Sequence, residues 1–94
     1  MFIIRNIFKC KPGQAKNVIE HLQNAMALMP DSKQRILVDH VADFWTVVLE
    51  LEVESVAAFE KQFQEYGQRE DVQKAMTGYL DSVMSGHREI YRVL

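Results

Sequence analysis

The sequence lacks the residues and runs that mark disulfide-rich and membrane-spanning proteins. Cys10 is the only cysteine among 94 residues, which excludes an intrachain disulfide and a cysteine-based metal motif. No apolar run approaches the roughly 18 residues of a membrane span. The apolar stretch at the amino terminus is too short for the core of a signal peptide. We therefore expect one domain over residues 1–94, located in the cytoplasm, with no membrane partner.

Positive charge and catalytic motifs are also scarce. Eleven Lys and Arg residues stand against 13 Asp and Glu residues, for a net charge of −2, and the two signs are interspersed. Such a chain lacks the basic field that a phosphate backbone requires, so no nucleic-acid partner is expected. The histidines, His21, His40 and His87, show no metal-ligand spacing, and no glycine-rich phosphate loop or nucleophile elbow occurs. The sequence predicts no metal site and no cofactor.

The sequence does contain alternating strand and helix patterns. Apolar strand-like segments stand at both ends, over residues 2–10 and 88–94, and branched residues mark two more strands around 36–38 and 47–49. Apolar side chains at helical spacing fill the intervals. The order βαββαβ predicts an α+β, ferredoxin-like sandwich, in which an antiparallel four-stranded sheet carries its helices on one face.

Short polar and turn signals set the expected boundaries. Pro30 should end the first helix, and Ser55 is a plausible N-cap for the second helical region. Gly67 should close the first part of that region, with a second helical pattern from Val72 to Val83. Ser85 and Gly86 should turn the chain into the last strand.

A tight hairpin is expected between the two central strands. If Ala42 and Asp43 form its turn, Val41 faces Phe44 and His40 faces Trp45 across the ladder.

The alternation of side chains along the strands predicts which face is left bare. The even-numbered residues of the first strand, and the odd-numbered row from Trp45 to Val53, are the apolar sets that should meet the helices. Four large apolar side chains then remain on a face that no helix of this chain covers: Ile3, Ile7, Phe44 and Val48. Burying each is worth roughly 1.5–3 kcal/mol. The sequence therefore predicts a homodimer joined through this face.

Two segments resemble a known superfamily. Phe8 to Gln14, with its lysine-proline-glycine turn, looks like the end of the first strand in dimeric α/β-barrel proteins. Leu49 to Ser55, followed by Ala57, Ala58 and Phe59, resembles their third strand running into the second helix. The resemblance implies a dimeric α/β barrel. The superfamily includes antibiotic-biosynthesis-type monooxygenases, haem-degrading monooxygenases, small isomerases, stress-response proteins and many members of unknown role.

The haem-degrading members offer one comparison residue by residue. Asn6 stands seven residues before Gly13, where these members have an asparagine. Val53 occupies the position of their tryptophan, and Thr77 and Tyr79 lie near the place of their iron-binding histidine. The resemblance therefore implies no haem binding.

Five residues are candidates for a ligand site. Asn6 could orient a ligand carbonyl or hydroxyl, or could be a buried amide satisfied by backbone or water. His40 beside Trp45 could act as an acid or base against an aromatic wall, or could be an edge-strand histidine that reaches solvent. Tyr66 and Tyr79 could line a cleft, as in cofactor-independent oxygenases of the superfamily that the chain resembles. Alternatively, their rings could serve packing alone, with the hydroxyl groups exposed to solvent.

Three functions follow, and the sequence leaves open whether the protein is an enzyme. The leading hypothesis is an uncharacterised small-molecule-binding dimer. The first alternative is a cofactor-independent monooxygenase for a small aromatic substrate, oriented by Asn6, His40 and Trp45. The second is a small isomerase or lyase with His40 as the catalytic base, which requires that histidine to point into a cleft.

Overall fold

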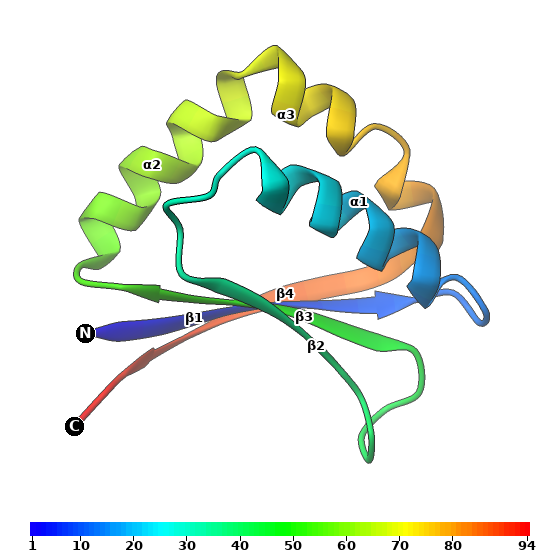
Figure 1. The fold of residues 1–94 in the computed structure, drawn as a ribbon. Helices are drawn as coiled ribbons and strands as arrows, with labels where there is room; N and C mark the ends of the chain where they lie inside the picture. The colour runs from blue at the N-terminus through cyan, green and yellow to red at the C-terminus, as the bar shows by residue number, and fades with distance from the viewer.

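The structure, a computed structural model, describes residues 1–94. Its elements are β1 (Phe2–Cys10), α1 (Ala15–Ala27), β2 (Gln34–Val38), β3 (Thr46–Val53), α2 (Val56–Gln68), α3 (Glu70–Ala75), the short 3-10 helix η1 (Tyr79–Ser82) and β4 (Val83–Arg92). The four strands form one sheet in the order β2-β3-β1-β4, with every neighbouring pair antiparallel. The expected α+β, ferredoxin-like sheet is confirmed (Figure 1).

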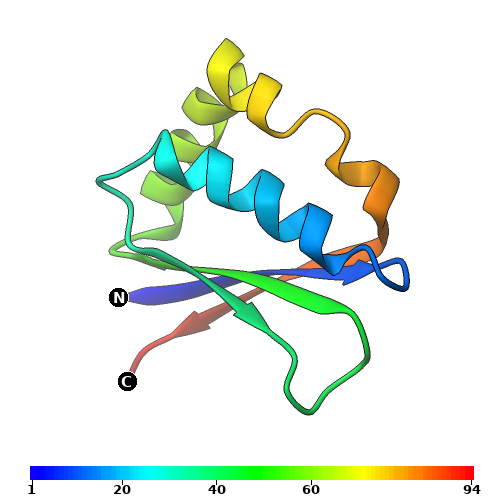
Figure 2. The same ribbon diagram turned by 45° about the vertical axis from the view of Figure 1, so that its right-hand side comes forward.

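All helices lie on one side of the sheet. In Figures 1 and 2, α1 runs across the sheet, while α2 and α3 rise beside it as an arch. The other side carries no element of this chain. The C-terminal end of β4 and the β2–β3 connection both bend away from the helices, toward this bare side (Figure 1). We call it the helix-free face.

The core lies between α1 and the centre of the sheet. Cys10 and Val47 from the strands pack with Val18 and Leu22 from α1. Ile4, another even-numbered residue of β1, is also sealed from solvent. These positions agree with the alternation read from the sequence. Burial raises the pKa of the Cys10 thiol, which therefore remains a neutral core side chain.

The boundaries around α2 and α3 differ in part from expectation. Ser55 is the N-cap of α2, and its hydroxyl accepts from the Ala58 N–H at 3.0 Å. Gly67 lies inside α2, and the left-handed glycine of this helical region is Gly78, with φ of 87°.

The last strand begins earlier than the sequence pattern indicated. It starts at Val83, and Ser85 and Gly86 lie within it, paired with Lys9 and Phe8. A Cβ atom at position 86 would approach the Ile7 carbonyl oxygen to 3.1 Å. Glycine at this position therefore permits close strand pairing, and it does not mark a turn.

The connection between β2 and β3 is a loop over residues 39–45, and the expected two-residue turn does not form. The register agrees with expectation, because Val38 pairs with Val47, but the strands end there. The Asp39 carboxylate accepts from the Thr46 N–H at 2.9 Å, which closes the loop at its base. Trp45 adopts a left-handed φ of 62°, which is unusual for a bulky residue and incompatible with a strand.

Candidate functional site

A cavity lies under the arch of α2 and α3, between the helices and the sheet. Its volume is about 540 Å³ and it is partly open to solvent. This volume lies in the range of about 300–1,000 Å³ that is typical of small-molecule sites. The side chains that line it are mainly hydrophobic and come from every layer; they include Phe8, Leu22, Met26, Met29, Leu49, Leu51, Phe59, Phe63, Val72 and Met76.

An arginine and an asparagine form the polar part of the wall. Asn6 on β1 pairs with Arg88 on β4, and both side chains lie on the helix-bearing face of the sheet. Arg88 Nε donates to Asn6 Oδ1 at 2.6 Å. Since a guanidinium can only donate, the amide oxygen of Asn6 must face it, and the amide nitrogen keeps its two N–H groups.

Aromatic rings hold the guanidinium of Arg88 in place. Its central carbon lies 5.2 Å from the ring centroid of Phe59 and 5.0 Å from that of Phe63. These distances are within the range of a cation–π interaction. The rings come from α2, so Arg88 connects the edge strand of the sheet to the helical arch. A second aromatic pair, Phe8 and Tyr79, also lines the cavity and meets edge to face with centroids 6.1 Å apart.

The cavity lining carries no carboxylate and no lysine. His87 also borders the cavity, but it pairs with Ile7 on the opposite side of the pleat, and its ring contacts Glu89 at 3.4 Å. Arg88 has no salt-bridge partner in the structure. The cavity is therefore an apolar space with one unneutralised cation at its wall.

The structure brings together some of the predicted ligand residues and separates others. Asn6, Tyr66 and Tyr79 line the cavity. His40 and Trp45 do not, because both lie in the loop over residues 39–45 and are exposed. The pairing of His40 with Trp45 depended on a ladder that ends at Val38 and Val47.

Sequence reasoning missed Arg88 and the two phenylalanines that it touches. The signal was present, because Arg88 and Ile90 alternate with His87 and Glu89 along the last strand. Once β1 and β4 are paired, Arg88 faces the helices beside Asn6. The register of two strands far apart in sequence decides this contact, and the sequence did not supply it.

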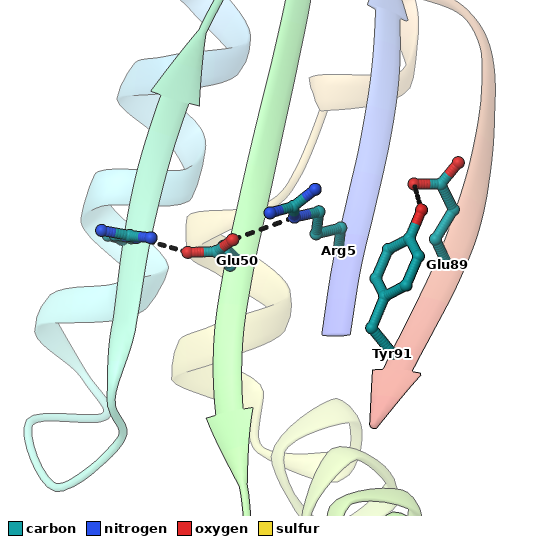
Figure 3. Close-up of polar contacts among 5 residues, drawn as sticks. Arg5, Glu50, Glu89 and Tyr91 are labelled. Carbon is teal, nitrogen blue, oxygen red and sulfur yellow. Dashed lines mark hydrogen bonds and ion pairs between the residues drawn. The ribbon is translucent and has the colours of Figure 1, made fainter. Parts of the chain in front are cut away.

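The helix-free face carries charged side chains beside its apolar ones. Glu50 lies at its centre on β3 and is only 4% exposed. It accepts from Arg5 Nε at 2.9 Å and also from Arg35 Nε. In Figure 3, Arg5 lies on one side of the Glu50 carboxylate, and a dashed line marks the bond between them. Ile3, Ile7 and Val48 are half-buried on this face, whereas Phe44 lies in the loop and is 79% exposed.

A second polar pair, on β4, lies beside Glu50 and its two arginine partners. The Tyr91 hydroxyl donates to Glu89 Oε1 at 2.8 Å (Figure 3). That bond is the main cause that lowers the pKa of the Glu89 carboxyl and raises the pKa of the Tyr91 phenol. The arginine charges on this face are thus matched by carboxylates on adjacent strands.

Glu50 should make the stability of the protein depend on acidic pH. The Arg35 hydrogen bond lowers the pKa of the Glu50 carboxyl from its usual 4.5, burial opposes this shift, and the Arg5 hydrogen bond lowers it further. The stabilisation is therefore complete above the unfolded-state pKa and is lost as pH falls below it, through the lower folded-state value. Glu50→Gln should cost about 1.5–3 kcal/mol at pH 7, because hydrogen bonds to a charged group are weakened.

Urea unfolding at several pH values would measure this effect. The free energy of unfolding of the wild type should fall more steeply between pH 5 and pH 3 than that of Glu50→Gln. If the free energy of unfolding falls equally with pH in the two proteins, the hydrogen bonds from Arg5 and Arg35 to Glu50 do not stabilise the fold.

Comparison with known proteins gives structural matches alone. No family model matches the sequence, and no curated protein matches it. An uncharacterised NIPSNAP domain protein from Burkholderia xenovorans superposes with a TM-score of 0.88 at 8% identity, covering 100% of this chain and 95% of that one. A putative antibiotic biosynthesis monooxygenase from Chloroflexus aurantiacus gives 0.77 at 14% identity, covering 99% and 92%. The chain shares the ferredoxin-like βαββαβ fold of these structures. At these identities the likeness shows the fold and no activity.

Two further features bear on metal and membrane sites. No group of three or more His, Cys, Asp or Glu side chains is arranged to hold a metal ion. No helix of the structure is both long and apolar enough to cross a membrane.

Proposed function

We propose that the protein binds a small, largely apolar molecule in the cavity under the α2–α3 arch. The cavity itself supports this proposal, because it has the size of a ligand site, an apolar lining and a few convergent polar groups. A core that served packing alone would be filled close to crystal density, with few voids larger than a water molecule. Asn6, Tyr66 and Tyr79 supply the polar groups that would orient the ligand.

The position of His40 favours binding over the catalytic alternatives. An isomerase or lyase with His40 as base needs the imidazole at the ligand, and His40 is exposed in the loop outside the cavity. A monooxygenase oriented by Asn6, His40 and Trp45 needs these three side chains together, and only Asn6 lines the cavity. The chain resembles monooxygenases in fold, and that likeness assigns no chemistry.

Calorimetric titration with 2-naphthol, a neutral apolar phenol, tests the proposal. We expect saturable binding with one site per chain. Trp45→Phe should leave the affinity unchanged, because Trp45 lies outside the cavity lining. The proposal would be overturned by an absence of saturable heat, or by binding that Trp45→Phe abolishes.

We propose further that two copies associate through their helix-free faces. Ile3, Ile7 and Val48 place apolar surface on this face, and the matched charges around Glu50 and Glu89 leave it without a strong field of one sign. Sheets that pack face to face bury such rows as a common core.

The loop over residues 39–45 supports the same assembly. It bends toward the helix-free side (Figure 1) and exposes Val41 at 91% and Phe44 at 79%. Exposed apolar side chains at the rim of an uncovered face mark an interaction surface. A second copy of the chain would cover both the face and the loop, and light scattering should then report about twice the chain mass of 10.9 kDa.

A further inference from the structure

We infer that the ligand carries a carboxylate, which Arg88 binds at the cavity wall, and that its apolar body lies under the arch. This inference rests on the proposed binding function and names the chemical class of the ligand. Neither the fold nor the predicted site residues pointed to it. Three properties of the Arg88 environment support it: its unused donors, the absence of a competing anion, and its fixed position.

Most of the hydrogen-bonding capacity of Arg88 is unused. The guanidinium has five N–H donors, and the only bond that it makes to protein is from Nε to Asn6. Its two terminal nitrogens have no acceptor in the chain. They form the planar fork that pairs with both oxygens of a carboxylate.

The neighbouring Asn6 adds a second free donor. Its oxygen is occupied by Arg88, and its amide nitrogen donates to no acceptor in the chain. No unpartnered side-chain nitrogen or oxygen is buried in the structure, so the Asn6 amide nitrogen is accessible to a ligand. Two adjacent groups thus offer donors and no acceptors, which is the pattern that an anion satisfies.

No group of the protein competes for this position. The cavity lining has no aspartate and no glutamate, and no carboxylate lies within ion-pair distance of Arg88. An arginine on a protein surface finds a carboxylate at little cost, yet Arg88 stacks on Phe59 and Phe63 instead. Arg88 is itself exposed to solvent, so an anion bound there would be held by the paired donors of the guanidinium fork, which match both oxygens of a carboxylate.

The aromatic contacts also fix where the ligand lies. Because Phe59 and Phe63 hold one side of the guanidinium and Asn6 holds Nε, the terminal nitrogens are presented from a single position. A carboxylate bound there leaves the rest of the molecule beside the apolar lining, which includes Met26 and Met76. A small aromatic or alicyclic carboxylic acid fits this arrangement, with its charged end at β4 and its body under the arch.

Matched titrations with 2-naphthoate and its neutral analogue 2-naphthamide test the inference. Wild-type protein should bind the carboxylate about tenfold or more tightly than the amide, as expected for a charge-assisted hydrogen-bond pair. Arg88→Gln should reduce the ratio of the two affinities to about one, because the neutral side chain no longer favours the charged probe. Arg92→Gln is the matched control, because it removes the same charge from the same strand outside the cavity lining, and it should keep the preference.

Asn6→Asp gives a second, isosteric test. The new carboxylate would pair with Arg88 and neutralise it, so the preference for naphthoate over naphthamide should again be lost. Equal affinities of the wild type for both probes would overturn the carboxylate assignment and leave ligand binding intact. A preference that survives both Arg88→Gln and Asn6→Asp would also overturn it. If none of naphthol, naphthoate and naphthamide binds, the proposed function itself fails.

Discussion

Ile7→Glu should convert the proposed dimer into monomers. Ile7 lies on the helix-free face beside Val48, and the symmetric interface would bury two copies of it. Full burial of such a side chain is worth about 1.5–3 kcal/mol, of which the dimer supplies only a part because Ile7 is already half-buried, and the variant would also place two like charges into the same interface. We expect the dissociation constant to rise by more than about a hundredfold, with a mass near 10.9 kDa in light scattering.

Val38→Glu provides the control for this experiment. Val38 is 59% exposed and pairs with Val47, so it lies on the helix-bearing side of the sheet. The same apolar-to-acidic change there should leave the mass at that of a dimer. A dimer that persists in Ile7→Glu, or a wild type that is monomeric at micromolar concentration, would contradict association through this face.

Ala25→Phe should abolish ligand binding while the protein remains folded. Ala25 is 5% exposed on α1 and lines the cavity. A phenyl ring at this position would occupy space that the ligand needs, and it would add apolar contacts where packing is incomplete. We expect at least about a hundredfold weaker binding of 2-naphthol, equivalent to about 2.8 kcal/mol, with no loss of melting temperature.

Ala57→Phe is the matched substitution outside the cavity. Ala57 is exposed on α2 and does not contribute to the lining. It should bind 2-naphthol as the wild type does. Full affinity in Ala25→Phe would place the binding site elsewhere. A strong drop in its melting temperature would show that the region around Ala25 is already closely packed.

The fold could be predicted because its signals are local and repeated. The branched residues of the strands alternate with period two, and the helix stripe through Val18 and Leu22 repeats at helical spacing. Ile4 and Val47 from the two helix-facing rows are sealed in the core, whereas Trp45, the first residue of the predicted odd-numbered row, lies exposed in the loop before β3. Each residue in these patterns indicates whether its own position faces the core or the solvent. Many such indications together predict one topology.

The site could be predicted only in part because it depends on contacts between distant segments. Asn6 was identified as an unusual amide in an apolar row, but its partner Arg88 lies 82 residues away in the chain. The grouping of His40 with Trp45 failed for a local reason. The Asp39 side chain takes the Thr46 N–H, which ends the ladder and opens a loop where a tight turn was expected. No pattern in the sequence distinguishes this longer loop from a tight two-residue turn.

Amide chemical-shift mapping by NMR with 2-naphthoate is the most direct test of a ligand site under the arch. The largest shifts should fall on residues that line the cavity from opposite layers, such as Asn6 and Arg88 on the sheet and Phe63 and Gly67 on α2. Amides of the loop over residues 39–45 should shift little. Shifts confined to that loop or to the helix-free face, or no saturable shifts, would contradict a ligand site under the arch.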